Sequence, residues 1–153
     1  MTAATTSITP ALQALLDTVR PWTGVRIRPR APGVLAFVLN TTEIGHLHPA
    51  GRLDIPFPER IAAVLRHETN ATRHPIDEKK NWVVLRIDSV EDVPEAVRLL
   101  RLAYIYRRIV RSDAAAEWQA LREELATLDV PPAVLDRYQR VLARRRGPKD
   151  GAQ

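Results

Sequence analysis

Cysteine is absent from this chain, and its absence removes several kinds of chemistry at once. Without a thiol there are no disulfides, no thiolate metal or iron–sulfur sites and no cysteine nucleophile. Aromatic residues are scarce at 5%, and no apolar run approaches the roughly 20 residues that cross a bilayer. The first nine residues lack the basic start and apolar stretch of a secretory signal, so we expect a cytoplasmic protein without membrane contact.

Several motifs of common enzymes are also missing. There is no glycine-rich phosphate loop, dinucleotide fingerprint or nucleophile elbow, so nucleotide-driven and serine-hydrolase chemistry are not expected. What is present is ordinary for a globular chain: 153 residues, of which 45% are hydrophobic and 27% charged. The formal net charge of +5, carried mainly by arginine, suits an acidic partner or a solvated surface.

Hydrophobic spacing predicts an α+β fold. Helical spacing begins after Thr9-Pro10, and a period of two begins near Val25. Because short turns join the first four predicted strands, these strands are expected to be antiparallel neighbours. The sequence predicts a curved antiparallel sheet with helices on one face (residues 1–111), and a C-terminal helical extension (112–153) packed on or next to it. The expected helices are 10–20, 58–70, 91–111, 112–128 and 131–147, and the expected strands 25–30, 34–39, 43–48, 53–57, 71–76 and 82–88.

The sharpest local signal is the pair His46 and His48. Residues two apart on a strand project from the same face, so both imidazoles can address one ligand. Three interpretations stay open: a general base in a metal-free pocket, two nitrogens of a metal site, or partly exposed histidines bonded to neighbouring strands. A metal would need further ligands, for which the candidates are His74, Glu43, Asp54 and His67, although strand parity disfavours Glu43.

Arginines and a tryptophan occupy the polar faces of two predicted strands. Arg26 and Arg28 lie on one strand and Arg86 on another, where Trp82 shares its face. With the histidines in the same sheet, they would form a cationic surface with an aromatic wall, suited to an enolate, carboxylate or phosphate. Alternatively the arginines form a solvated stripe. Asp54 is a candidate to orient a histidine by accepting a ring N–H.

Residues 22–108 resemble the small luciferase-domain family, known from fungal bioluminescence and many bacterial proteins. The resemblance implies a substrate like the enolic pyrone that fungal members oxidise with molecular oxygen, and no flavin or nicotinamide cofactor. It favours the metal-free pocket. A tryptophan strand followed by a long helix is also loosely similar to the YjbR-like fold. The matching segments are Gly24–Pro29, Glu43–His48, Asp54–Pro58, His74, Trp82–Ile87, Glu91–Pro94 and Leu102–Tyr104, whereas Lys80-Asn81 departs from the Ser-Gly pair typical of the family.

Together these observations predict a small-molecule-binding protein, as a hypothesis a cofactor-independent oxygenase-like enzyme acting on an enolisable aromatic or pyrone-like molecule. His46 and His48 would act as base and orienter, with Arg86 and Arg28 stabilising the anion. No metal or cofactor is expected. The remaining substrate-binding candidates are Arg26, Trp82, His74, Asp54 and Tyr104.

The alternative is a non-catalytic module that binds a ligand, a nucleic acid or a protein. The basic segment Arg144–Arg146 could contact nucleic acid, but acidic residues interleave the tail and no aromatics cluster there for base stacking. Self-association through Trp118 and Tyr138 of the tail helices is a third possibility.

Overall fold

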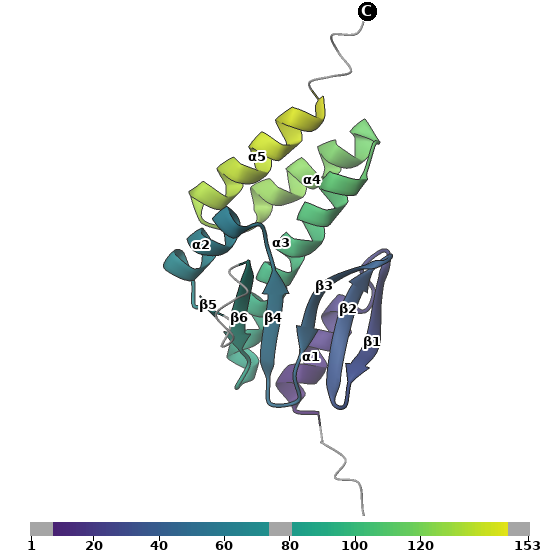
Figure 1. Cartoon of the computed structure of the whole chain (residues 1–153), viewed down its shortest axis with the longest axis vertical. Coiled ribbons are helices and arrows are strands. Elements are labelled where there is room, and N and C mark those ends of the chain that lie inside the picture. Colours follow the sequence, from purple (N-terminus) through teal and green to yellow (C-terminus); the bar gives the residue numbers. More distant parts are fainter. Residues whose placement is uncertain (1–7, 74–80, 147–153) are drawn as a thin grey trace, which may run out of the picture.

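The computed structural model describes residues 8–73 and 81–146 and has the predicted order of elements (Figure 1). The helix that begins after Thr9 is capped by the Thr9 hydroxyl, which accepts from the Leu12 amide. Within these ranges no helix combines the length and the apolarity that crossing a membrane requires. The elements are α1 (Pro10–Val19), β1 (Val25–Ala31), β2 (Val34–Leu39), β3 (Thr42–Leu47), β4 (Arg52–Pro56), α2 (Glu59–Glu68), β5 (Thr72–Arg73), β6 (Trp82–Arg86), η1 (Val90–Asp92), α3 (Val93–Arg111), α4 (Ala115–Thr127) and α5 (Pro132–Arg146).

All described strands belong to one antiparallel sheet with the order β1-β2-β3-β4-β6-β5. The predicted edge strand 71–76 is seen over Thr72 and Arg73, and its remainder lies outside the described residues. β3 and β4 pair only at His46 with Asp54 and at Leu47 with Leu53. On the side of these two pairs away from the connecting turn, β3 and β4 diverge, as Figure 1 shows.

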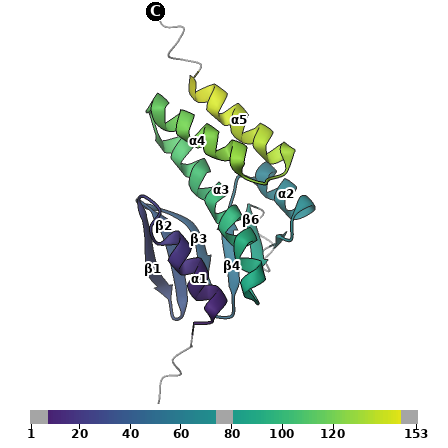
Figure 2. The ribbon, with the colours of Figure 1, turned by 180° about the vertical axis from the view of Figure 1, so that it is seen from behind.

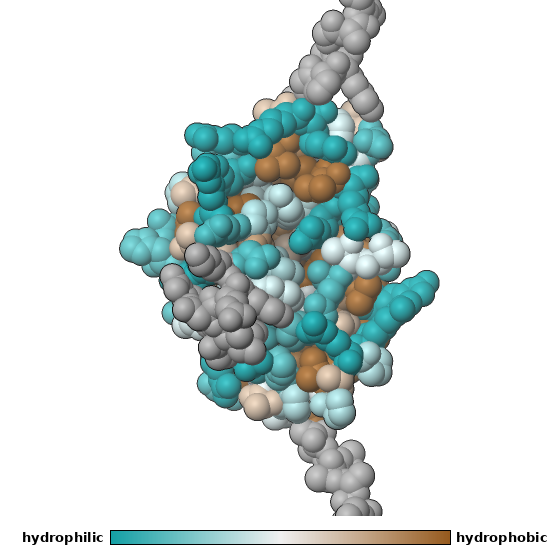
Figure 3. All heavy atoms as spheres, viewed as in Figure 1, coloured by the Kyte–Doolittle hydropathy of each residue, from teal (hydrophilic) through white to brown (hydrophobic). Residues whose placement is uncertain are grey.

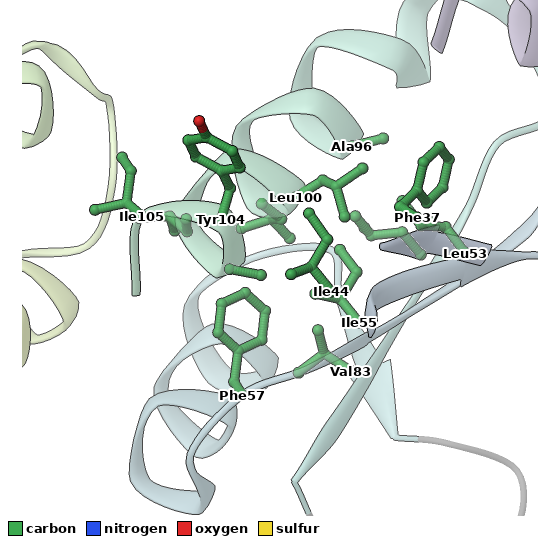
Figure 4. Packing of buried hydrophobic residues seen from close by; sticks show 14 of the residues in the cluster. Phe37, Ile44, Leu53, Ile55, Phe57, Val83, Ala96, Leu100, Tyr104 and Ile105 are labelled. Atoms are coloured by element: carbon green, nitrogen blue, oxygen red, sulfur yellow. The ribbon is translucent and has the colours of Figure 1, made fainter. Parts of the chain in front are cut away.

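Helices α1 and α3 lie against one face of the sheet, seen from behind in Figure 2. The strands send alternate apolar side chains toward these helices, including Leu53, Ile55 and Val83, which are fully buried. Figure 4 shows them packed with Ile44 and Leu100. The opposite face, turned to the viewer in Figure 1, is called here the open face; hydrophilic side chains cover much of it (Figure 3). The α+β prediction with helices on one face is confirmed.

Helices α4 and α5 pack on α3, and α5 also packs on α2. The hydroxyl of Tyr138 donates to the Leu102 carbonyl at 2.7 Å, and Arg101 makes two hydrogen bonds of 2.6 Å with Glu124. Trp118 is 6% exposed and Tyr138 is fully buried. The idea that these two rings mediate self-association is therefore wrong, because both fill the protein's own core.

Candidate functional site

The open face brings the two histidines and Asp54 together at the join between the halves of the sheet. His46 pairs directly with Asp54 across β3 and β4, so their side chains project from the same face. His48 follows β3 by one residue and shares the parity of His46, while Leu47 between them is buried in the core. His46 is 4% exposed and Asp54 is not exposed at all. Among the described residues, His46 and Asp54 are the ones classed as buried and polar or charged. The hydrogen bond between them offsets the free-energy cost of removing them from water.

One carboxylate oxygen of Asp54 lies within hydrogen-bond distance of both imidazoles. Nε2 of His46 lies 2.9 Å from Oδ2 of Asp54, and Nε2 of His48 lies 3.0 Å from the same oxygen. The two rings meet edge to face, with centroids 5.1 Å apart. A carboxylate only accepts hydrogen bonds, so we assign the proton of each ring to Nε2. Both histidines then donate to Asp54, and Nδ1 of each ring keeps its lone pair.

Arg30 completes the surroundings of His46. Its Nη1 lies 2.8 Å from Nδ1 of His46, so the guanidinium donates to the lone pair that the assigned tautomer leaves there. Arg30 is the extra residue at a β-bulge, where the register between β1 and β2 shifts between Pro29 and Ala31. Bulges re-aim side chains, and this one turns Arg30 toward the histidine. With both ring nitrogens engaged and almost no exposure, His46 is suited to hold Asp54 rather than to accept a proton from a ligand.

Glu43 also reaches the cluster, contrary to the parity argument. Its Oε2 lies 3.4 Å from Nδ1 of His46, and its Oε1 lies 3.4 Å from Nε of Arg30. A second bulge causes this, because Phe37 of β2 pairs with Gly45 while Val38 pairs with Glu43, leaving Ile44 as the extra residue. The bulge restores Glu43 to the face of His46. Gly45 fits here because a Cβ would lie 2.9 Å from the Leu100 side chain.

Arg52 binds the opposite side of the cluster. Its Nε lies 3.2 Å from Oδ1 of Asp54, and its Nη2 lies 2.8 Å from Nε2 of His48. Because guanidinium nitrogens only donate, Nη2 does not hydrogen-bond to Nε2 in the assigned tautomer, and Arg52 acts as the charge partner of Asp54. The turn from β3 to β4 holds these residues together, since the His48 amide donates to the Arg52 carbonyl at 2.9 Å. Gly51 in that turn has φ +90°, and a Cβ there would lie 2.5 Å from the Ile87 carbonyl oxygen. Only glycine fits this turn without strain.

The electrostatics set the charge of each group. Burial, the largest influence on Asp54, would raise its pKa, but the hydrogen bonds from His46 and His48 and the Arg52 charge together lower the pKa to about 2. Burial lowers the pKa of His48; the hydrogen bond to Asp54 opposes this effect and the Arg52 charge adds to it. At neutral pH the site therefore holds an ionised Asp54 and a neutral His48.

The cluster offers the ligand atoms of a metal site, but the positive charges around it disfavour a cation. Ligand atoms of His46, His48 and Asp54 lie within 4.8 Å of one another, and two histidines with one carboxylate typify non-haem iron sites. However, Arg30 and Arg52 each place a guanidinium nitrogen 2.8 Å from a ring nitrogen. A divalent cation would have to displace these guanidinium groups and would face two positive charges at short range. The arrangement suits an anionic ligand better than a metal.

Trp82 joins the cluster and Arg86 lies at its margin. The Trp82 ring lies 5.1 Å from the His46 ring, centroid to centroid, so Trp82 is brought beside the histidines as expected, and its role as an aromatic wall stays a prediction. Arg86 pairs with Arg52 across β4 and β6 and therefore shares the open face. Its side chain is 58% exposed and lies 3.6 Å from Asp88 in an ion pair, so Arg52 rather than Arg86 contacts the histidines.

The other predicted residues lie elsewhere. Arg28 faces Ala36, which in turn faces His46, so a whole strand separates the arginine from the histidine. With Arg26 it lines a separate hollow. Tyr104 lies on α3, on the helix side of the sheet, and its hydroxyl donates to the Thr23 carbonyl at 2.9 Å. This position makes it a core residue rather than part of the open-face site. His74 lies outside the described residues.

Sequence reasoning missed Arg30 and Arg52 as site residues. Arg52 stands two residues before Asp54, and that spacing alone places both on one face of a strand. The signal for Arg30 is Pro29, since proline inside a strand often marks a bulge or an edge. The glycine in β3 is the equivalent signal for Glu43.

The fold and site define a class: an α+β protein with a partly buried His–Asp–His cluster on the open face of an antiparallel sheet. Residues 41–103 match the family model described as Luciferase domain. This segment carries His46, His48, Asp54 and Trp82, and it confirms the resemblance to the luciferase-domain family. No curated protein matches the chain. No solved structure matches it either, so the similarity to the YjbR-like fold stays a prediction.

Proposed function

We propose that this protein binds a weakly acidic enolic small molecule at the open face and removes its enol proton with His48. The observation that carries the proposal is the buried, ionised Asp54 carboxylate, which accepts from both imidazoles at 2.9 and 3.0 Å. This contact supports Nε2 of His48 as the donor to Asp54, which leaves Nδ1 as the proton acceptor. His46 and Asp54 are then positioning residues.

The side chain of His48 suits this role better than that of His46. It is 25% exposed, against 5% for His46, and the structure describes no hydrogen-bond partner for its Nδ1 among residues 8–73 and 81–146. Its lowered pKa keeps the imidazole neutral and able to accept a proton near pH 7.

The two flanking guanidinium groups support the choice of an anionic intermediate. Arg52 lies at the His48 ring and Arg30 at the neighbouring His46 ring, so the cluster presents two cations to an anion bound on the open face. Arginine is well suited to this task because it stays charged and offers several N–H donors. Arg52 and Arg30 thus replace Arg86 and Arg28 as the proposed anion-stabilising residues.

The resemblance to the luciferase-domain family makes molecular oxygen the co-substrate in this proposal. The enol proton passes to His48, leaving an enolate and an imidazolium. The enolate carbon supplies the electron pair of a new carbon–oxygen bond to molecular oxygen, and the terminal oxygen takes the proton back from His48. The product is a hydroperoxide, the histidine is restored, and no flavin or nicotinamide takes part.

Oxygen uptake with a panel of weakly acidic cyclic enols that keep their enol proton at the assay pH tests the proposal. A general base typically contributes 10²–10⁴-fold, so His48→Gln is expected to lower the rate of uptake by about that factor. Asp54→Asn should also lower it, because the carboxylate that orients the base is lost. His67→Gln is the matched control, since His67 lies on α2 outside the cluster.

Wild-type uptake in both His48→Gln and Asp54→Asn would refute the assigned roles. Calorimetric binding of panel members by the wild-type protein without any oxygen uptake would refute the catalytic step and leave a ligand-binding module.

A further inference from the structure

A hollow rich in arginine lies among the helices and shares no residue with the His–Asp–His cluster. It has a volume of about 300 Å³ and is bounded by the first turn of α2, by α3 and by α5, which packs beside α2 (Figure 1). Four of the five charged residues that line it are arginines, namely Arg60, Arg137, Arg140 and Arg144, and the acidic one is Glu59. The hollow therefore carries a positive charge.

The spacing of the arginines on α5 directs them to this hollow. Arg137, Arg140 and Arg144 recur at intervals of three and four residues, so they lie in one stripe of the helix. Val141 belongs to the same stripe and also lines the hollow. Arg60 lines it from α2. Because arginine carries its charge on a long stem, all four guanidinium groups can reach one anion bound there.

The stability of the helices does not account for this gathering of charge. Like charges three or four residues apart destabilise a helix, and a cation in the first turn, where Arg60 stands, opposes the helix dipole. Of the arginines on α5, Arg144 stands in the last turn, where a cation is favoured. Asp136 lies 3.1 Å from Nε of Arg140, in an ion pair whose side chains are both exposed. Within the described part of the chain, Arg60, Arg137 and Arg144 make no ion pair.

We propose that this hollow binds the polyphosphate group of a compact, multiply charged ligand. Arginine presents a planar fork of N–H donors that matches phosphate oxygens in pairs, and several arginines match several adjacent negative charges. Buried Ile61 and partly buried Tyr106 and Val141 add apolar surface to the walls. Apolar walls lower the local dielectric constant, which strengthens the attraction between the charges. The volume stands at the small end of typical ligand sites, roughly 300–1,000 Å³, which favours a compact ligand over a long strand.

Calorimetric titration of the full chain with inorganic tripolyphosphate at low ionic strength tests the proposal. Arg137→Gln and Arg60→Gln, on different helices, are each expected to raise Kd about tenfold, because a hydrogen bond between charged groups is lost. Arg122→Gln on α4 is the matched control, since it removes the same charge from a residue that does not line the hollow and whose guanidinium donates to Gln119. This control should change Kd by less than about twofold, because salt screens a distant charge.

The absence of tripolyphosphate binding would overturn the proposal. An equal loss of affinity in Arg60→Gln, Arg137→Gln and Arg122→Gln would do the same, because that result is expected of net charge alone. Citrate tests the preference for phosphate, and an affinity equal to that of tripolyphosphate would contradict it. A short thymidine oligonucleotide tests the other source of phosphate groups. If it binds more tightly than tripolyphosphate and loses affinity in the Arg60 and Arg137 variants, the occupant is a nucleic-acid strand and the compact ligand is wrong.

Discussion

Replacing Asp54 with asparagine removes the charge on which the cluster depends, and the effect on stability is expected to vary with pH. The pKa of Asp54 is lowered from 3.8 to about 2 in the folded protein. At about 1.4 kcal/mol per pKa unit, the ionised carboxylate contributes about 2 kcal/mol to the free energy of unfolding. Because the folded pKa lies below the unfolded one, this contribution is complete above about pH 5 and is lost as the pH falls through about 2.

Urea unfolding of the wild-type protein and of Asp54→Asn at a series of pH values measures this contribution. The wild-type protein should be more stable than the variant by about 2 kcal/mol at pH 7, and the difference should close as the pH falls from about 5 to 2. Asp88→Asn is the control on the same face, because the Asp88 side chain is 71% exposed and contributes little. A difference between wild type and Asp54→Asn that stays constant down to pH 3 would refute the reasoning.

Three further predictions concern the surroundings of the cluster. Arg52→Gln should raise the pKa of His48, since the Arg52 charge is one of the causes that lower it, whereas Arg86→Gln should not; titration of the His48 ring protons by NMR measures both, and equal shifts would contradict the assignment. Gly51→Ala should lower stability by more than about 1 kcal/mol in thermal unfolding, because it combines positive φ with a backbone clash. Gly33→Ala, which faces only the Pro49 side chain, should cost less, and the reverse order would be inconsistent with the described turn. Zinc, iron(II) or EDTA should leave Tm unchanged, and a metal-induced rise in Tm that His48→Gln abolishes would show that the arginines do not exclude a cation.

Much of the architecture could be predicted from the sequence because its signals are local. Thr9-Pro10 marks the start of α1, and the alternation from Trp82 to Ile87 separates the core face from the open face. The sharing of one face by His46, His48 and Trp82 follows from the same period of two.

The partners of the histidines could not be predicted in the same way, because two β-bulges interrupt that period. Arg30 is the extra residue of one bulge, and Ile44 is the extra residue of the other, which returns Glu43 to the side of His46. A shift of one residue reverses the face of everything beyond it, so parity alone misplaced Glu43. Strand pairing was also needed to show that Arg52 rather than Arg86 contacts His48.

The most direct test of the account is the protonation state of the His48 ring, read from ¹⁵N chemical shifts of the imidazole nitrogens at pH 7. The account predicts a neutral ring with its proton on Nε2, directed to Asp54, and an unprotonated Nδ1 available to a ligand. In Asp54→Asn this preference for one tautomer should weaken. A proton on Nδ1 in the wild-type protein, or a fully protonated imidazolium at pH 7, would contradict the central claim that Asp54 prepares His48 as the base.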